Sequence, residues 1–195
     1  GFGASSSGMT DNRVNNVDQG TKFEKPSYTF SENAYNSYFA RINYDFNDKY
    51  FFEATYRKDG SSLFGKNKRY ADFYSIGANW NAKRESFLED LEWLNKLNVR
   101  VSYGTTGNSG ISEYLANGLI GSSSQYDGKE TWGLSQVENP DLTWETVEST
   151  NIGINARLFD FVDVELEFYN KNTKDMLMEI PYSYATGFSG GWGNI

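Results

Sequence analysis

Alternation of apolar and polar residues with a period of two is the dominant pattern along the chain. Six segments carry it: 38–46, 50–58, 74–81, 97–104, 144–158 and 163–169. In the first segment every second residue from Tyr38 to Phe46 is apolar, whereas Arg41, Asn43 and Asp45 lie between them. Successive side chains of a β-strand point to opposite faces. Each segment therefore predicts a strand with one apolar face and one polar face.

The connections between these segments are of two kinds. Those near Asn47 and Asp160 are a few residues long, whereas 59–72, 105–143 and the part after Lys174 are long, polar and rich in Gly, Ser and Asn. Short turns on one rim and long loops on the other are typical of outer-membrane barrels, whose long loops lie outside the cell. Apolar residues at helical spacing in 86–94 predict a short amphipathic helix on the short-turn, periplasmic rim.

Aromatic residues concentrate near the ends of the apolar faces. One end carries Tyr44, Phe46, Phe52 and Trp80, and the other carries Tyr38, Tyr56, Tyr74, Tyr103 and Phe168. Two aromatic girdles around an aliphatic band indicate a bilayer, although the high β-propensity of aromatic residues is an alternative explanation. Glu148 interrupts the apolar face of its strand, so we expect it above the membrane.

Composition restricts the chemistry that the chain can perform. It contains no cysteine and no histidine, which excludes disulfides, thiolate nucleophiles, imidazole bases and the usual zinc or haem ligands. A net charge of -8 argues against nucleic acid as a partner. Carboxylates are abundant enough for a glycosidase pair, but no spacing singles out two of them, so we do not expect an enzyme.

Membrane insertion through strands remains compatible with the low mean hydropathy of -0.65. A strand that faces lipid on one side and a wet lumen on the other is hydrophilic on average. Six strands cannot close a barrel of useful width, and open edges are not tolerated in hydrocarbon. We therefore expect the sequence to be part of a longer chain.

The two ends of the sequence differ from the strand region. Residues 1–34 form a polar mixture without a period, and we expect an extracellular loop or insertion there. Asp11, Asn15, Asn16 and Asp18 offer calcium ligands, but the EF-hand spacing is absent, which favours a solvated loop. We expect barrel strands over 35–175 and the start of another extracellular loop over 176–195.

Six short motifs occur in a fixed order between residues 38 and 188. They are 57–65 (RKDGSSLFG), 100–108 (RVSYGTTGN), 139–145 (NPDLTWE), 151–153 (NIG), 169–175 (YNKNTKD) and 186–188 (TGF). In order and spacing they resemble the SusC/RagA family of TonB-dependent outer-membrane transporters from Bacteroidetes. The chain departs from that family at Tyr74, where a proline is expected before Ser75, and at Asn79, where glycine commonly precedes the tryptophan.

The resemblance implies a transmembrane antiparallel β-barrel of about 22 strands, of which this chain supplies about six, with an internal plug. It further implies import of glycans or peptides energised through TonB, together with a SusD-like surface lipoprotein, in a bacterial outer membrane. No cofactor is implied. The plug and the segment that contacts the TonB complex are expected upstream, in the missing N-terminal region.

Polar-face residues are the candidates for contact with the plug or the substrate path. They are Arg41, Asn43, Asp45, Glu53, Arg57, Asn79, Arg100, Glu145, Asn155, Arg157, Glu165 and Glu167. Alternatively these side chains simply neutralise one another across strands. A symmetric turn at Asp160 predicts Arg157 opposite Asp163, and Asn155 opposite Glu165.

Loop residues form a second candidate group for contact with a ligand or a lid protein. They are Asp59, Ser61, Asn108, Tyr114, Tyr126 and Trp132. The Asp59 to Ser62 string is equally a turn, because Asp and Ser accept hydrogen bonds from nearby amides and Gly allows positive φ. The three aromatic residues are equally suited to a small core within the loops.

Two other functions fit parts of the pattern. A soluble all-β carbohydrate-binding module also has aromatics and glycine-rich loops on short strands, but its apolar faces would pack against each other. A small standalone barrel, acting as an adhesin or an enzyme, would need about eight strands and an aromatic terminal residue. The packing of the apolar faces therefore distinguishes the module from the transporter.

Overall fold

The computed structural model describes residues 2–7, 16, 21–23, 27–28 and 30–195. The chain divides into two compact units, Gly1–Glu32 and Asn33–Ile195. The first unit contains two short antiparallel pairs: β1 (Phe2–Gly3) with β4 (Ser27–Tyr28), and β2 (Ser6–Ser7) with β3 (Lys22–Phe23). Asp11, Asn15 and Asp18 lie outside the described residues, so calcium binding stays untested.

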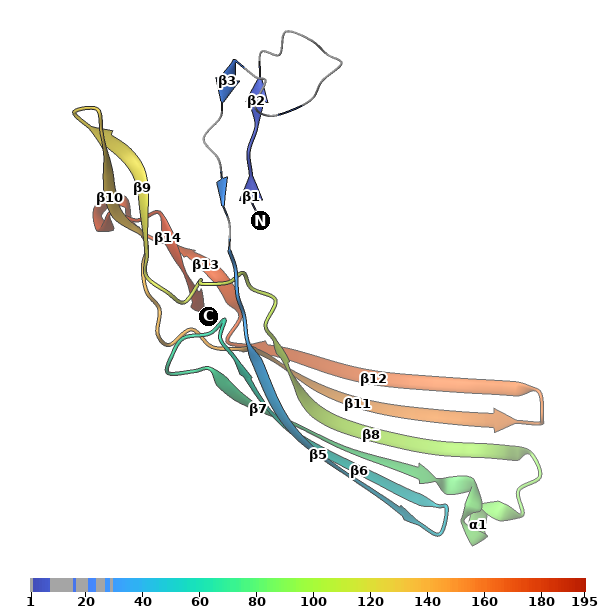
Figure 1. Ribbon diagram of the computed structural model, residues 1–195. Helices are drawn as coiled ribbons and strands as arrows, with labels where there is room; N and C mark the ends of the chain where they lie inside the picture. The colour runs from blue at the N-terminus through green and yellow to red at the C-terminus, as the bar shows by residue number, and fades with distance from the viewer. Residues whose placement is uncertain (1, 8–15, 17–20, 24–26, 29) are drawn as a thin grey trace. The chain divides into compact units, whose positions relative to one another are not determined.

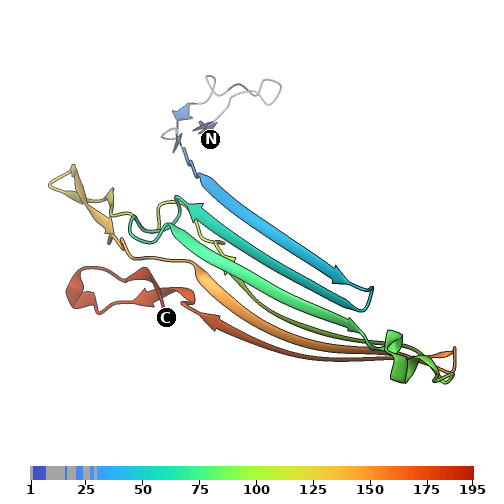
Figure 2. The same ribbon diagram turned by 90° about the horizontal axis from the view of Figure 1, so that it is seen from below.

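The second unit is built around a curved antiparallel sheet of six strands (Figures 1 and 2). They are β5 (Tyr35–Phe46), β6 (Tyr50–Ser61), β7 (Tyr70–Asn81), β8 (Leu94–Asn108), β11 (Glu145–Leu158) and β12 (Val162–Lys174). Each strand pairs with the next of the six, and β5 and β12 form the two edges. The predicted all-β antiparallel fold is confirmed as an open part of a barrel wall. No helix in the described part of the chain has the length and apolarity to cross a membrane.

The register of the sheet joins the apolar positions into continuous rows. One row crosses all six strands and consists of Tyr44, Phe52, Ala78, Val101, Ile152 and Phe168. No second layer covers this face among the described residues, because Ile42 is 69% exposed and Ile76 is 59% exposed. Apolar faces packed against each other, which a soluble module requires, are therefore not found in the described part of the chain.

Two tight turns close strand pairs at one rim. In the β5–β6 turn Asn47 and Asp48 have φ of 55° and 53°, and Lys49 N donates to Phe46 O at 3.1 Å. In the β11–β12 turn Phe159 and Asp160 have φ of 53° and 63°, and Phe161 N donates to Leu158 O at 3.3 Å. The two turns share one backbone geometry with different side chains.

The β7–β8 connection at this rim is mostly irregular. It contains a 3-10 turn, η2 (Ala82–Arg84), and a single helical turn, α1 (Ser86–Glu89). The helix predicted over 86–94 is therefore confirmed only for its first four residues. The Lys83 ammonium donates to the carbonyls of Leu88, Glu89 and Leu91 at 2.9 Å each. These bonds satisfy carbonyls at the end of the helical turn and just after it, so the chain can leave the helix at this point.

The long connections contain strands that the sequence pattern did not predict. β9 (Leu119–Tyr126) pairs with β10 (Lys129–Gln136), and β13 (Leu177–Pro181) pairs with β14 (Gly190–Asn194), with a 3-10 turn η3 (Tyr184–Thr186) between the last two. The β9–β10 register shifts between Thr131 and Trp132 and again between Leu134 and Gln136. Each shift breaks the period of two, and the alternation in the sequence is lost.

A small hydrophobic core holds the long connections together. It consists of Phe64, Phe73, Ala116, Leu142 and Trp144. The Trp144 ring lies 4.6 Å from the ring of Phe64 and 5.7 Å from that of Phe73, between centroids. Side chains added at two motif glycines would collide with this assembly, Gly65 with the Pro140 carbonyl and Gly107 with the Phe73 ring. Motifs 57–65, 100–108 and 139–145 therefore encode the packing of this core.

Truncation of Leu142 to alanine should open this loop core. Leu142 is fully buried, and removal of such a side chain costs roughly 2–5 kcal/mol. Hydrogen exchange of the Gly65 amide, which donates to Leu142 O at 2.9 Å, should therefore become faster. Leu134→Ala on the exposed face of β10 is the matched control and should leave this amide unchanged. Equal protection of Gly65 in both variants would contradict the assigned core.

Candidate functional site

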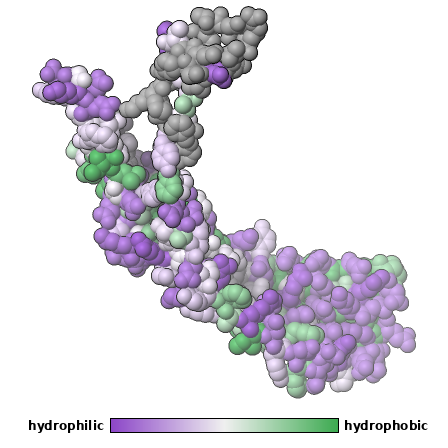
Figure 3. Space-filling view, viewed as in Figure 1, coloured by the Kyte–Doolittle hydropathy of each residue, from purple (hydrophilic) through white to green (hydrophobic). Residues whose placement is uncertain are grey.

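The face opposite the apolar rows is polar across the whole sheet. All twelve polar-face candidates lie on this face, because the register pairs the polar positions of each strand with the polar positions of its neighbours. One row contains Asp45, Phe51, Asn79, Arg100, Gly153 and Glu167 in spatial order. Figure 3 shows the face of the sheet turned toward the viewer as predominantly hydrophilic. The side chains needed for a wet surface are thus collected on one side.

Charges on this face are largely paired with one another. Arg41 binds Glu53 at 2.7 Å, and Arg100 binds Glu165 at 2.9 Å and Glu167 at 3.5 Å. Each of these side chains is roughly half exposed, so each pair by itself adds little to stability. Their main effect is to leave a polar surface with little uncompensated charge.

The predicted pairing at the Asp160 turn is confirmed. Arg157 is opposite Asp163, and their charged groups lie 3.8 Å apart. Asn155 is opposite Glu165 as predicted, but the Glu165 carboxylate turns to Arg100 on the next strand but one. The pair Arg100–Glu165 therefore crosses β11. Gly153 makes this possible, since a side chain there would collide with that of Arg100.

A groove of about 620 Å³ lies along the sheet. The small residues Ser75, Gly77 and Ser102 contribute to its lining, together with the charged groups of Glu53 and Arg100. Because three neighbouring positions lack long side chains, the wall is hollowed there. Such a surface can accept a packed segment of protein or a passing solute.

A second hollow, of about 430 Å³, lies at the other ends of the strands, beside the loop core. Its lining includes Tyr35, Arg57, Asp59, Phe73 and Trp144. Arg57 Nε donates to Asp59 Oδ1 at 2.6 Å. Since Asp59 is buried, it fixes the position of the more exposed guanidinium.

Asp59, Ser61 and Asn108, predicted as possible ligand contacts, have structural partners here. Ser61 is buried, and its hydroxyl accepts from Leu63 N at 3.2 Å. Asn108 donates to Glu145 Oε1 at 3.1 Å and accepts from Gly110 N at 2.9 Å. These bonds favour the turn interpretation of both motifs, and a ligand role for the three residues stays a prediction.

The three loop aromatic residues, Tyr114, Tyr126 and Trp132, do not all lie on one structural element. Tyr126 and Trp132 lie on the β9–β10 hairpin and are strongly exposed. Tyr114 precedes that hairpin and has a φ of 66°. None of the three belongs to the described loop core, so the alternative that they form it is wrong.

Aromatic residues on the polar face, among them Phe39, Phe51 and Tyr169, are absent from the candidates chosen from the sequence. Phe39 is 82% exposed and directly opposite Arg57, Tyr169 is 73% exposed and opposite Asn151, and Phe51 lines the groove. Their parity relative to Arg41 and Glu167 would have assigned them to this face. The search for charged and amide side chains passed over them.

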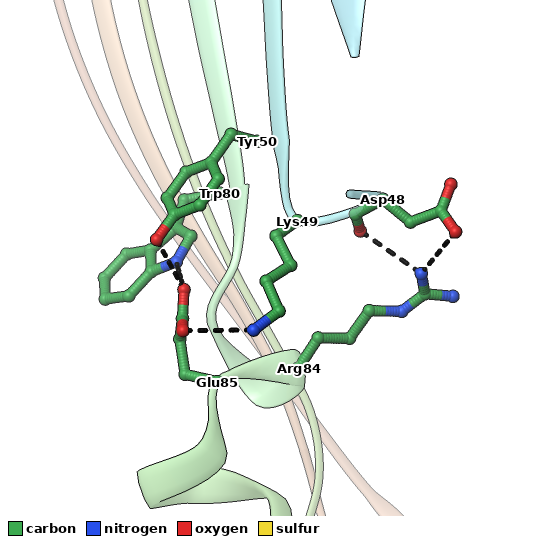
Figure 4. A network of polar contacts seen from close by, with 6 residues as sticks. All are labelled: Asp48, Lys49, Tyr50, Trp80, Arg84 and Glu85. Carbon is green, nitrogen blue, oxygen red and sulfur yellow. Dashed lines mark hydrogen bonds and ion pairs between the residues drawn. The ribbon is translucent and has the colours of Figure 1, made fainter. Parts of the chain in front are cut away.

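A polar network ties the β7–β8 connection to the β5–β6 turn (Figure 4). Glu85 accepts from Tyr50 Oη at 2.6 Å, from Trp80 Nε1 at 3.2 Å and from Lys49 Nζ at 3.3 Å. Arg84 binds the Asp48 carboxylate at 3.0 Å. The hydrogen bond from Tyr50, followed by those from Trp80 and Lys49, lowers the pKa of Glu85 below its ordinary value.

In the described part of the chain, no cluster of three or more carboxylates is placed to hold a metal ion. The polar face thus offers ion pairs, amides, hydroxyls and several aromatic rings. Together with the exposed apolar face opposite, it makes a wall with one apolar side and one polar side.

Comparison with known proteins identifies this two-faced wall. Residues 2–194 match the family described as TonB dependent receptor-like, beta-barrel. The chain belongs to this TonB-dependent receptor β-barrel family. It is 33% identical, over its full length and 20% of the relative, to TonB-dependent receptor P26 of Formosa agariphila. It is 31% identical to TonB-dependent receptor SusC of Bacteroides thetaiotaomicron, over 85% of the chain and 17% of the relative.

Solved structures agree with this assignment to the TonB-dependent receptors. The RagAB peptide importer in the closed-closed state matches with a TM-score of 0.90 and 34% identity, over 99% of this chain and 22% of that one. The open-open state matches with a TM-score of 0.88. The SusC/RagA resemblance is thus confirmed. The chain spans about a fifth of the length of these relatives.

Acidification should loosen the rim network of this receptor wall. Because the pKa of Glu85 is lowered in the folded state, its contribution to stability is complete above the ordinary glutamate pKa of about 4.3. That contribution is lost as pH falls through the folded-state value. Melting temperatures of the wild type and Glu85→Gln should therefore differ at neutral pH and converge as the pH falls below the ordinary glutamate pKa. A difference between the two proteins that stays constant at all pH values would refute the assignment.

Proposed function

We propose that this chain forms part of the barrel wall of a TonB-dependent nutrient importer in a bacterial outer membrane. The apolar rows face outward and contact acyl chains. The polar face points inward and lines the lumen, where it meets the plug and the substrate path. The single observation that carries the proposal is the contrast between the two faces. One is apolar and exposed on all six strands, and the other is polar and largely charge-paired.

The dimensions of the apolar face support a bilayer as its environment. On β5 the aromatic ends Tyr38 and Phe46 are eight residues apart, which is about 26 Å along the strand. A tilt of about 40° reduces this to about 20 Å, comparable with the apolar band of about 25 Å in outer-membrane barrels.

The polar groups above this band support the same placement. Tyr56 Oη donates to Asp72 at 2.5 Å, and Lys174 pairs with Glu148 at 2.7 Å. The Tyr74 and Tyr103 rings lie beside each other, with centroids 6.1 Å apart. Glu148, which breaks the apolar pattern, thus has a cationic partner at the level where headgroups are expected.

The relatives support a proposal about the partners and the cargo. The solved structures with similar walls are of the RagAB peptide importer, and another relative is SusC. For this chain we propose a SusD-like surface lipoprotein as partner, TonB as energy source, and a peptide or an oligosaccharide as cargo. Similar walls in open and closed RagAB structures support a static role for this segment.

Arginine placed on the two faces of β7 should have opposite consequences. Ala78 lies in the middle of the outward row, and arginine at the bilayer midplane costs roughly 2–4 kcal/mol. Ala78→Arg should therefore lower the amount of heat-modifiable, folded receptor in the outer membrane. Gly77→Arg, on the adjacent inward position, should fold in near-normal amount. Equal amounts of both variants would contradict a lipid-facing outward row.

Extraction of the full-length receptor should test location and partner together. We expect the protein in the outer-membrane fraction, released only by detergent, and accompanied by a surface lipoprotein that mass spectrometry identifies. Recovery without detergent would refute the membrane placement. Recovery from the membrane without any lipoprotein would refute only the proposed partner.

A further inference from the structure

Arg57 is bonded differently from the other arginines of the polar face. In Arg41, Arg100 and Arg157 a terminal guanidinium nitrogen, Nη2, donates to a neighbouring carboxylate or carbonyl group. In Arg57 the inner nitrogen, Nε, donates to Asp59, and neither Nη group has a hydrogen-bond partner among the residues that the structure describes. The Arg57 side chain is 60% exposed. The N–H donors of both Nη groups are therefore open to another molecule.

Asp59 fixes the direction of this guanidinium. The two residues lie on the same face of β6, and the Nε–Oδ1 distance is 2.6 Å. Because the Asp59 side chain is only 9% exposed, its carboxylate cannot turn into solvent and release the guanidinium. A guanidinium held at Nε presents its two Nη groups side by side. In this arrangement arginine donates two parallel hydrogen bonds to one carboxylate.

The hollow of about 430 Å³ around Arg57 combines hydroxyl groups with buried aromatic rings. Ser37 and Thr106 are among the hydroxyl residues of its lining, and their hydroxyls can donate to a carboxylate. Phe73 and Trp144 also line it, and both are buried members of the loop core. Charge-assisted hydrogen bonds are stronger beside such apolar groups than in open water. The lining is thus suited to an anionic group of the size of a carboxylate.

The position of the hollow places it on the path of incoming cargo. Arg57 is opposite Phe39 on β5 and opposite Phe73 on β7, and β6 ends shortly beyond it, at Ser61. This is the end of the sheet that bears the long loops, which face the outside of the cell in outer-membrane barrels. In the proposed importer, a solute from outside therefore meets Arg57 before it reaches the middle of the lumen.

We propose that Arg57 binds a carboxylate of the cargo, through its two Nη groups, at the outer mouth of the lumen. The proposal rests on the proposed function and adds that the cargo carries a carboxyl group. An oligopeptide and an oligosaccharide with uronic acid units both supply one. Arg57 and Asp59 are the only charged residues in the described lining, and together they are neutral. The ligand is therefore selected by the geometry of the donors, and not by net charge.

Comparison of free acids with their methyl esters tests this assignment. The full-length receptor, purified in detergent with any lipoprotein that accompanies it, is immobilised and exposed to two mixtures. One is a tryptic digest of casein and the other is a set of oligogalacturonates, each combined with its own methyl-esterified form. Mass spectrometry measures the captured amounts. We expect the free acids of one mixture to be captured at least about tenfold more than their esters, because an ester lacks the charged acceptor.

Arg57→Gln should abolish this preference for the free acids. Lys58→Gln is the matched control, because it removes the same charge from the adjacent position of β6, and Lys58 pairs with Asp72 on the outward face. We expect the control to retain the preference. The ratio of acid to ester is measured on folded, heat-modifiable receptor, so a lower yield of either variant does not alter it.

The remaining outcomes separate the failure of this subsite from the failure of the proposed function. Equal capture of acids and esters by the wild type would overturn the subsite and leave the importer standing. A preference that survives Arg57→Gln, or one that Lys58→Gln also abolishes, would do the same. Capture of neither mixture in either form would overturn the proposed cargo, and the subsite with it.

Discussion

The backbone hydrogen-bond ladder between neighbouring strands is the interaction on which the structure depends. In hydrocarbon an unpaired N–H or C=O group costs several kcal/mol, so a strand that crosses it must be paired along its whole apolar length. The β8–β11 ladder meets this demand from the Asn108–Glu145 pair to the Leu94–Leu158 pair, with one register shift at the rim. The same ladder fixes the register of the strands, and the register determines which side chains share a face of the sheet.

The two faces of the sheet differ in how many charged side chains they carry and in how those charges are paired. The outward face is free of charge over the aliphatic band and meets charge above it, in the pairs Glu148–Lys174 and Lys58–Asp72. The inward face carries many charges but pairs them locally, as in Arg41–Glu53 and the Arg100 cluster. This pairing keeps the polar face from strongly attracting one sign of ion.

The sequence predicts the wall well and the loops poorly, for one physical reason. Alternation is a local signal, so Arg157 and Asp163 were placed opposite each other from the turn alone. The loop core depends on Phe64, Leu142 and Trp144 from segments far apart, and no local period records such contacts. For the same reason Asp59 and Ser61 suggested a ligand site, although both are buried. The aromatic rings of Phe39 and Tyr169 were left out because only charged and amide side chains of this face were taken as candidates.

The loop core also has a consequence for how the wall assembles. Phe73 reaches this core from β7 and Trp144 from the position just before β11, whereas Phe64 comes from the loop between β6 and β7. A pairing error of one residue would turn side chains to the opposite face and would carry Trp144 away from Phe64. The loop core can therefore form only when the strands are paired in the correct register, and its packing favours that register over a shifted one.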